Sequence, residues 1–305
     1  MATIEQVLRQ LAEWGYRGAA ISTWQASDLR ADIEARHRDG LFDEDFYEER
    51  LASFEFQPPE GLPDAKSIFA VAVPDPQVQI TFTRGRRALP VIVPPTYLHW
   101  QDVDKRVEDA LTEILAPSGH HAALASLPKK LTAVRSGLAA YGKNNVTYVP
   151  GMGSYHRLVV LWADVPLDED NRHDLRVMDV CEKCQACQRV CPTGAIDPDR
   201  FLLHAERCLT FLNEKPPDVP FPDWVDPAWH NCLVGCMRCQ RACPENKEVR
   251  DWVVGDEVFS EAETRLLLDG VTPEHLPPET LAKLERLDLM ELLEIVPRNL
   301  TALLG

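Results

Sequence analysis

The order of apolar and polar residues predicts separate strands and helices over the first half of the chain. Residues 4–16 and 100–115 carry apolar side chains at intervals of three and four, the period of an amphipathic helix. Residues 67–73 form a continuous apolar run between a Pro- and Gly-rich loop and a proline, which is typical of a buried strand. We also expect a short strand at 20–24, a charged helix at 27–52, an apolar run broken by two prolines at 89–100 and another strand at 154–167.

The second half of the chain has a different pattern. Residues 176–250 contain few long apolar runs, so we expect a bound metal to organise this segment. Residues 251–305 indicate short helices between Pro-rich turns, and we expect their apolar stripes to pack back on the preceding segment rather than bind a partner. The pattern predicts an α+β chain in three parts: 1–175, 176–250 and 251–305.

The chain is acidic, with 48 Asp and Glu against 32 Lys and Arg, a formal net charge of −16 over 305 residues. A protein that grips a nucleic-acid backbone needs a basic surface, so we expect no nucleic-acid partner. The N-terminal sequence shows no basic segment followed by an apolar one, no twin arginine and no membrane-spanning run. We therefore expect a cytoplasmic protein without a membrane partner.

Four of the nine cysteines lie in the stretch "CEKCQACQRVCP". Cys181, Cys184, Cys187 and Cys191, followed by Pro192, match the C-x2-C-x2-C-x3-C-P run of bacterial ferredoxins. In a two-cluster ferredoxin the first three thiolates hold one [4Fe–4S] cluster and the fourth crosses to the other. In a reducing compartment this spacing indicates metal binding rather than disulfides.

A second run supplies three more thiols: Cys236, Cys239 and Cys243, before Pro244. Leu233 stands where the first cysteine of this run would be, so Cys208 or Cys232 must provide the eighth ligand, and we favour Cys208. In the crossed arrangement the two ligand sets are Cys181, Cys184, Cys187 and Cys243, and Cys191, Cys208, Cys236 and Cys239. Zinc held by paired C-x2-C units is the alternative, which the two proline-terminated runs disfavour.

The segments "CEKCQACQRVCPTGAI", "RCLTF" and "GCMRCQRACPEN" resemble the iron–sulfur domain of epoxyqueuosine reductases and of corrinoid-dependent reductive dehalogenases. The family has the same asymmetric second run, with the missing cysteine supplied from an "RC" segment, which implies that Cys208 is a ligand. Upstream, "LPDAKSIFAVAVP" and "RSGLAAYGKNNVTYVPGMGSYHRLVVLWADVPL" are similar to further segments of the family, so the resemblance covers residues 1–250.

The resemblance implies a nitroreductase-like N-terminal domain that binds cobalamin without a protein ligand to cobalt, followed by a two-cluster ferredoxin-like domain and a short helical tail. The clusters would pass electrons to the corrinoid, which supplies the hard chemistry. With the resemblance, the candidates for cofactor binding lie in "YGKNN": Tyr141, Gly142, Lys143, Asn144 and Asn145. The alternative is a polar turn, because Asn tolerates left-handed backbone.

Three departures from the family argue against epoxyqueuosine as the substrate. The family's catalytic aspartate would fall near Ala123, and the chain has no Asp or Glu from residue 114 to 163. The last 55 residues are too few for the family's tRNA-binding helical repeats, and the net charge disfavours tRNA. We therefore expect an unidentified small molecule as substrate, with a low-potential ferredoxin or flavodoxin as the electron donor.

Without a carboxylate in this window, a proton donor must be another group. Tyr97 and Tyr155 are the candidates, although a buried core tyrosine is the commoner role for either. The window also holds several Lys and Arg residues, which predict either a pocket for an anionic ligand or ordinary basic helix ends: Lys129, Lys130, Arg135, Lys143 and Arg157.

Two other functions compete with a corrinoid-dependent reductase. The missing aspartate is also compatible with a non-catalytic electron-transfer module that reduces the corrinoid or flavin of a partner protein. A reductase that binds flavin in the N-terminal domain is the third hypothesis. The cofactor that the protein retains separates the three.

Overall fold

The computed structural model describes residues 3–167 and 169–304. The chain forms two compact units, each built from segments that are distant in sequence. Unit 1 consists of residues up to 74, then 100–185 and 196–204, and unit 2 consists of 75–99, 186–195 and 205 onward. These boundaries differ from the three predicted parts, because residues 75–99 leave the N-terminal half to pair with a strand near the C-terminus.

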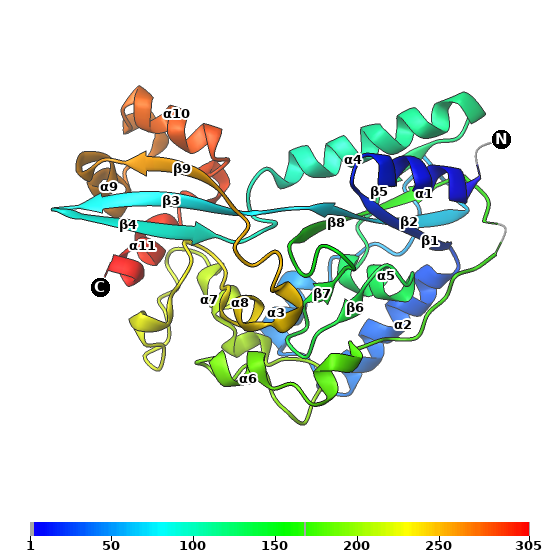
Figure 1. Cartoon of the computed structure of the whole chain (residues 1–305), viewed down its shortest axis with the longest axis horizontal. Helices are drawn as coiled ribbons and strands as arrows, with labels where there is room; N and C mark the ends of the chain where they lie inside the picture. The colour runs from blue at the N-terminus through cyan, green and yellow to red at the C-terminus, as the bar shows by residue number, and fades with distance from the viewer. Residues whose placement is uncertain (1–2, 168, 305) are drawn as a thin grey trace. The chain divides into compact units, whose positions relative to one another are not determined.

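Unit 1 is built around a four-stranded antiparallel sheet in the order β1-β2-β8-β5 (Figure 1). The two central strands are almost entirely buried, which explains why their sequences are continuous apolar runs rather than alternating ones. A separate two-stranded ribbon carries the "YGKNN" segment in its turn. The strands are β1 (Arg17–Ser22), β2 (Ser67–Pro74), β5 (Ala122–Leu124), β6 (Ala140–Tyr141), β7 (Thr147–Tyr148) and β8 (His156–Ala163).

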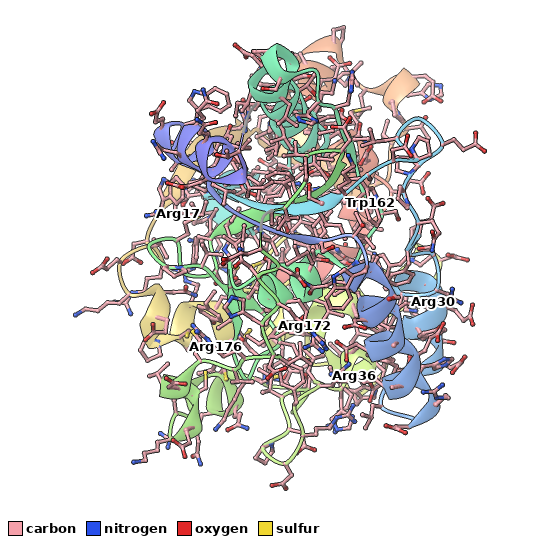
Figure 2. The ribbon with its side chains drawn as sticks, turned by 90° about the vertical axis from the view of Figure 1, so that its right-hand side faces the viewer. Arg17, Arg30, Arg36, Trp162, Arg172 and Arg176 are labelled. Carbon is pink, nitrogen blue, oxygen red and sulfur yellow. The ribbon has the colours of Figure 1, made fainter. Side chains whose placement is uncertain are left out.

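Helices cover both faces of this sheet. Successive side chains of a strand point to opposite faces, so Phe69 and Leu161 pack with α1 and α4, whereas Ile68 and Trp162 pack with α2 and α5. The sheet therefore lies inside the unit, with Trp162 in its interior (Figure 2). The helices are α1 (Ile4–Glu13), α2 (Gln25–Arg38), α3 (Glu44–Arg50), α4 (Trp100–Leu115) and α5 (Lys129–Arg135).

A buried ion cluster ties α4 and α5 to β8. Two Asp104 carboxylate oxygens accept hydrogen bonds of 2.6 and 2.7 Å from the Arg157 guanidinium, and the Lys129 amine donates a third of 2.9 Å. Burial alone would raise the pKa of Asp104, but the hydrogen bonds and charges of Arg157 and Lys129 outweigh it and lower the pKa. This cluster holds the helices against the strand that carries Arg157.

Unit 2 is organised by a three-stranded mixed sheet in the order β4-β3-β9. β3 and β4 form an antiparallel hairpin, and β9 adds to β3 in parallel, with Phe82 paired to Phe259 and their rings stacked at 5.3 Å. The strands are β3 (Gln77–Arg84), β4 (Arg87–Val93) and β9 (Val253–Phe259), and the helices are α6 (Ala186–Val190), α7 (Leu209–Asn213), α8 (Arg238–Ala242), α9 (Glu261–Leu268), α10 (Pro278–Arg286) and α11 (Val296–Leu304).

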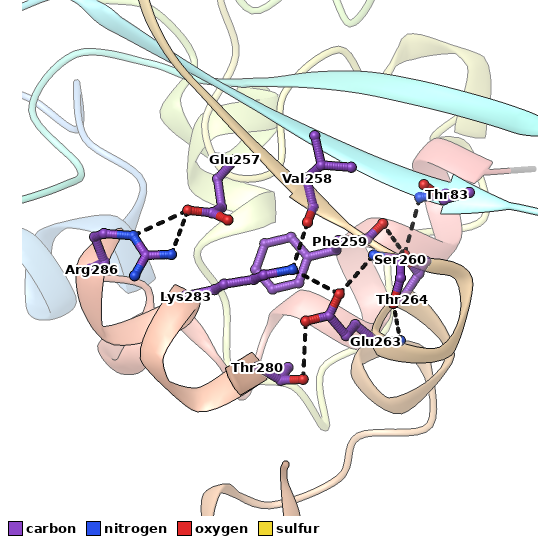
Figure 3. Close-up of polar contacts among 10 residues, drawn as sticks. All are labelled: Thr83, Glu257, Val258, Phe259, Ser260, Glu263, Thr264, Thr280, Lys283 and Arg286. Carbon is purple, nitrogen blue, oxygen red and sulfur yellow. Dashed lines mark hydrogen bonds and ion pairs between the residues drawn. The ribbon is translucent and has the colours of Figure 1, made fainter. Parts of the chain in front are cut away.

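The C-terminal helices pack on this sheet and on the cysteine-bearing loops of unit 2, as the apolar stripes predict. A polar cluster connects α9 to α10: the Glu263 carboxylate accepts from Ser260 N–H at 2.8 Å, from Lys283 at 2.9 Å and from the Thr280 hydroxyl at 3.2 Å (Figure 3). In α11, the Asn299 amide donates to the backbone carbonyls of Asn213 and Leu233, both at 3.0 Å. The tail is therefore part of the scaffold that holds these loops.

The predicted helices at residues 4–16 and 100–115 and the strands at 67–73 and 154–167 are present, with shifted ends. The charged stretch 27–52 holds two helices, α2 and α3, instead of one. β9 was missed because most of its side chains are exposed, so its sequence has no apolar periodicity. Within the described residues, no helix is both long enough and apolar enough to span a bilayer. The nitroreductase-like arrangement of the N-terminal domain stays a prediction.

The substitution Asp104→Ala should lower the free energy of unfolding by about 3–5 kcal/mol, because it leaves the buried Arg157 and the partly buried Lys129 without their counter-ion. The lowered pKa of Asp104 means that this stabilisation is present above the ordinary Asp pKa and is lost as the pH falls through the folded value. Urea unfolding monitored by circular dichroism measures the change. The control is Glu5→Ala, which breaks the exposed pair with Arg9 and should cost about 1 kcal/mol or less. Equal losses in the two variants would contradict the assignment.

Candidate iron–sulfur centre

The first cysteine run winds through short helical turns, as ferredoxin spacing requires. Cys181 is buried in the 3-10 helix Asp179–Glu182, and its N–H donates to the Met178 carbonyl at 2.9 Å. Cys187 lies in α6, and Cys191 follows that helix directly, before Pro192. All nine thiols of the chain are free rather than joined in disulfides.

The second run repeats this arrangement within unit 2. Cys239 lies in α8, Cys243 follows the helix, and Pro244 comes next. The two short helices α6 and α8 pack against each other. The two runs therefore match in structure as well as in sequence. Each contains a five-residue helix that is followed directly by a Cys-Pro pair.

Three thiols from separate segments of unit 2 gather near one another: Cys191, Cys208 and Cys236. Burial, with a smaller contribution from the neighbouring Cys236 and Cys191 thiols, raises the pKa of Cys208 to about 11. Burial likewise raises the pKa of Cys236. These thiols are poor thiolates by themselves, and a positively charged metal centre would stabilise their ionised form.

The donor set fits iron–sulfur clusters. Within the described part of the chain, no three His, Cys, Asp or Glu side chains are close enough to hold a single metal ion. The thiols instead lie on separate turns, and the three in unit 2 converge from both cysteine runs and from the "RC" segment. A cluster would take its ligands from such crossed segments and would supply one-electron transfer.

Cys232 is built into the scaffold around Cys236. It is buried, pairs with Ile92 of β4 in a parallel bridge, and its thiol donates to the side-chain oxygen of Asn231 at 3.2 Å. The same Asn231 oxygen accepts the N–H of Met237 at 3.0 Å. The Asn231 amide donates to the Cys236 sulfur at 3.2 Å. Asn231 therefore bonds the Cys236 sulfur, the Met237 N–H and the Cys232 thiol, and the bond to Asn231 together with the bridge to Ile92 holds Cys232 in the scaffold.

The "YGKNN" turn is fastened to the loop of Cys181 and Cys184 within unit 1. The Lys143 amine donates to the carbonyls of Glu182 and Cys184, at 3.3 and 3.2 Å. Backbone bonds join Tyr141 to the strand before Cys181, because its N–H donates to Arg176 and its carbonyl accepts from Met178, both at 2.8 Å. The turn thus braces the first cysteine loop.

The other side chains of this turn also have internal partners. The Asn144 amide is buried and donates to the Tyr148 hydroxyl at 3.1 Å. Asn145 has a left-handed backbone with φ of 55°, and its side chain bonds the Phe201 carbonyl at 2.7 Å and the Leu203 N–H at 2.8 Å. A Cβ on Gly142 would lie 2.5 Å from the Asn144 oxygen. These contacts match the polar-turn alternative, and they leave these amides unavailable to a corrinoid in this conformation.

The two tyrosines proposed as proton donors occupy different settings. The hydroxyl of Tyr97 donates to the Glu214 carboxylate, and burial together with that negative charge raises its pKa well above the usual range. Tyr97 also fills the space beside Gly235, where a Cβ would lie 2.8 Å from its hydroxyl oxygen. Tyr155 is fully buried directly before β8. The raised pKa makes Tyr97 a weak acid, so its contacts favour a structural role beside the Cys236 loop.

The Lys and Arg side chains of the carboxylate-free window, residues 114–163, have partners within the protein. This favours ordinary basic helix ends over a pocket for an anionic ligand. Lys129 and Arg157 bind Asp104, and Arg135 binds Asp32 at 2.5 Å. Lys130 donates to the Asn145 carbonyl at 3.3 Å. The buried His156 has its pKa lowered by burial to about 4, so it is neutral at physiological pH and bonds Thr147 and the Gly153 carbonyl.

Sequence reasoning missed the polar residues that hold the cysteine loops in place. Asn231, Asn213 and Asn299 all bond backbone groups of the loop from Cys232 to Met237: Asn213 donates to Gly235 at 2.7 Å and Asn299 to Leu233 at 3.0 Å. Their positions follow no spacing rule, because each partner comes from a different segment. The position of Asn231 next to Cys232 was the only signal in the sequence.

Residues 180–246 match a family model described as a 4Fe-4S double cluster binding domain. This match supports two [4Fe–4S] clusters and leaves no support for the zinc alternative. It does not by itself assign the individual ligands, which stay a prediction.

Comparison with known proteins extends the likeness beyond the cysteines. The chain is 34% identical over 161 residues to an epoxyqueuosine reductase from Pseudomonas aeruginosa, an alignment that covers 50% of this chain and 43% of that protein. The structure of epoxyqueuosine reductase from Bacillus subtilis superposes with a TM-score of 0.66 at 22% identity, over 98% of this chain and 80% of that one. The resemblance to the epoxyqueuosine reductases is confirmed.

The comparisons establish the fold of the chain, and they also show that the match covers only part of each curated relative. The structural match establishes an α+β fold of the same kind, with a double-cluster domain. The chain spans only 29% to 43% of the length of the first curated relatives that it matches. Activity, substrate and partners of those longer proteins are therefore not transferred with the fold.

The expectation of no nucleic-acid partner is wrong. A structure of epoxyqueuosine reductase with an epoxyqueuosine-modified tRNA stem loop superposes on this chain with a TM-score of 0.61 at 20% identity, over 99% of this chain and 82% of that one. The exclusion failed because a net charge is a sum over the whole chain, whereas RNA contacts one local surface. The free small-molecule substrate that accompanied this exclusion is not retained.

Replacement of Cys208 by serine should remove one cluster, so that reconstituted protein holds about four iron atoms per chain instead of about eight. Cys232→Ser is the matched control and should keep about eight, because the Cys232 thiol bonds the Asn231 side chain and serine can make the same bond. Iron analysis and electron paramagnetic resonance (EPR) of the reduced protein measure the difference. If Cys232→Ser loses the cluster and Cys208→Ser retains it, the ligand assignment is reversed.

Asn231→Asp should make the reduction potential of one cluster more negative. The substitution keeps the shape of the side chain, removes the N–H donor to Cys236 and adds a negative charge beside its sulfur. An EPR-monitored redox titration measures both potentials, and the other cluster serves as the internal control. An unchanged potential, or the same shift in both clusters, would show that the Asn231 contact does not tune this centre.

Proposed function

We propose that this chain is an iron–sulfur reductase that acts on an oxidised nucleoside carried by RNA, of the epoxyqueuosine type. The single observation that carries the proposal is the double-cluster cysteine pattern, set within a chain that aligns with epoxyqueuosine reductases on both sides of it. The name of these relatives specifies reduction of an epoxide. Their substrate is part of the proposal for this chain.

The chemistry suits a protein with two clusters. Removal of an epoxide oxygen as water consumes two electrons and two protons, and each [4Fe–4S] cluster carries one electron. Two clusters can therefore hold both electrons before the substrate is reduced. The protein's task is to hold the substrate close to the electron source and to deliver the protons.

Support for a short electron route comes from the "YGKNN" turn. Lys143 and Tyr141 bond directly to the backbone of the loop that carries Cys181 and Cys184. A group held at this turn would lie beside the first cysteine loop.

We further propose that a corrinoid is bound on the electron route between the clusters and the substrate. The resemblance implies it, and a bound corrinoid would supply a strongly reducing metal centre. The side chains of Asn144 and Asn145 are already bonded within the protein, so they do not fit as its ligands. We therefore assign no step of the reaction to the corrinoid, and other groups of the chain would have to bind it.

Proton delivery must differ from that of the relatives. One of the matched structures is described by the position of its catalytic aspartate loop, yet this chain has no carboxylate from residue 114 to 163. Tyr155 stays the predicted donor within unit 1, whereas the raised pKa of Tyr97 makes that residue the weaker candidate. A donor other than a carboxylate would shift the pH dependence of turnover toward higher pH.

The experiment is anaerobic turnover with reconstituted full-length protein, a chemical reductant and tRNA that carries epoxyqueuosine, with and without added cob(II)alamin. We expect the modified nucleoside to lose one oxygen atom, as measured by mass spectrometry, and the EPR signal of cob(II)alamin to change on binding. Cys208→Ser is the control, since it should lack one cluster and fail to turn over.

Two outcomes would contradict the proposal. If both clusters assemble and are reduced but the nucleoside stays intact with or without a corrinoid, the protein is an electron-transfer module for a partner. If turnover requires added flavin instead of cob(II)alamin, the proposed reductase activity is supported but the proposed corrinoid is wrong.

A further inference from the structure

The β3–β4 hairpin ends in a turn made almost entirely of arginine. Arg84 closes β3, Gly85 and Arg86 form the two-residue turn, and Arg87 opens β4. Gly85 has a φ of 59°, as the first central position of a type II′ turn requires. β9 pairs with β3 only as far as Phe82, so the turn projects past the end of its neighbouring strand (Figure 1).

The three arginines of this turn form no ion pair within the described part of the chain, although the Glu261 carboxylate accepts a hydrogen bond from the backbone of the turn at Gly85. All three are exposed, and their side chains make no hydrogen bond or ion pair with any described residue. Arg84 and Arg87 are directly opposite each other in the hairpin register. Like charges in directly opposed positions destabilise a hairpin, so this arrangement opposes the stability of the fold.

Several other surface arginines are neutralised by carboxylates. In unit 1, Arg30 binds Glu34 at 2.6 Å and Arg36 lies 3.5 Å from Asp32, both within α2. Arg172 binds Asp28 at 3.1 Å, and Figure 2 shows these arginines over the α2 side of the unit. Among the described residues, Arg17, Arg38 and Arg106 are also unpaired, but they come from three different elements, whereas Arg84, Arg86 and Arg87 stand together at one turn.

The scaffold holds this turn in place. The Gly85 N–H donates to the Glu261 carboxylate at 3.2 Å, and the Thr83 N–H donates to the Thr264 hydroxyl of α9 at 3.1 Å (Figure 3). Thr264 lies one turn after the Ser260–Glu263 capping box that fixes the start of that helix. The arginines are therefore presented from a fixed backbone, which lowers the entropy lost when they bind.

We propose that the turn Arg84–Arg87 binds the phosphate backbone of the RNA that carries the substrate. The inference rests on the proposed function and names a surface that recognises the RNA. Guanidinium groups bind phosphate oxygens through a planar pair of donors. A protein partner would call for an aromatic or apolar centre within the patch, and residues 84–88, "RGRRA", offer none.

The test compares two triple variants that remove the same charge. One is Arg84→Ala with Arg86→Ala and Arg87→Ala. The control is Arg17→Ala with Arg38→Ala and Arg106→Ala, three exposed arginines of unit 1 whose side chains also have no partner among the described residues. Binding of a fluorescently labelled tRNA stem loop is followed by anisotropy from low to moderate salt.

We expect the hairpin variant to bind the stem loop about tenfold or more weakly at low salt, with a salt slope reduced by about two to three phosphate contacts. The control should retain the affinity and slope of the unmodified protein. Equal weakening in both variants would reveal a bulk charge effect and overturn the proposal, as would unmodified protein that binds no RNA.

Binding is measured apart from turnover, so the two proposals can fail separately. If the hairpin variant binds RNA with normal affinity, the turn Arg84–Arg87 is not the RNA-binding surface, even if the protein reduces the modified tRNA. A hairpin variant that loses RNA affinity, in a protein that binds RNA but reduces nothing, supports the surface and removes the proposed reaction. Loss of binding to an acidic ferredoxin instead of RNA would assign the turn to a protein partner and overturn the proposal.

Discussion

Hydrogen bonds from half-buried and buried side chains to backbone groups of the loops are the constraint on which the cysteine region depends. This region has little apolar surface, so it cannot rely on a large hydrophobic core. Lys143 secures the loop of Cys184, and Asn145 secures the chain at Phe201 and Leu203. In unit 2, Asn299 secures the chain after Cys208 and before Cys236. The loops are ordered by polar contacts whose other ends are embedded in well-packed elements.

This construction changes the meaning of several polar residues. A side chain such as Lys143 or Asn145 looks like a ligand when only its sequence is considered, because it is a donor next to a glycine. In the structure the same donors satisfy backbone carbonyls, which would otherwise lose hydrogen bonds to water without replacement. The residues that matter for electron transfer then include those that position the thiols.

Much of the fold and the double-cluster domain could be predicted from the sequence, whereas the polar contacts of the site could not. The continuous apolar runs of β2 and β8 marked buried strands, and the Cys-Pro runs indicated iron–sulfur clusters because both patterns are local. β9 and Asn231 escaped prediction because their roles depend on segments far away in the chain. The charge argument failed for a related reason: it averaged over a surface on which Arg84, Arg86 and Arg87 stand together.

The parallel pairing of β3 with β9 has a consequence for biosynthesis. Gln77 pairs with Val253, so the chain must grow by 176 residues before this contact can form. At about 5–20 residues per second, β3 remains without its partner strand β9 for roughly 9–35 seconds of synthesis. During that time Ile80 and Phe82 lack the cover that the C-terminal helices later provide. All nine cysteines are synthesised within this interval, so the seven that belong to unit 2 are present before the sheet of that unit is complete.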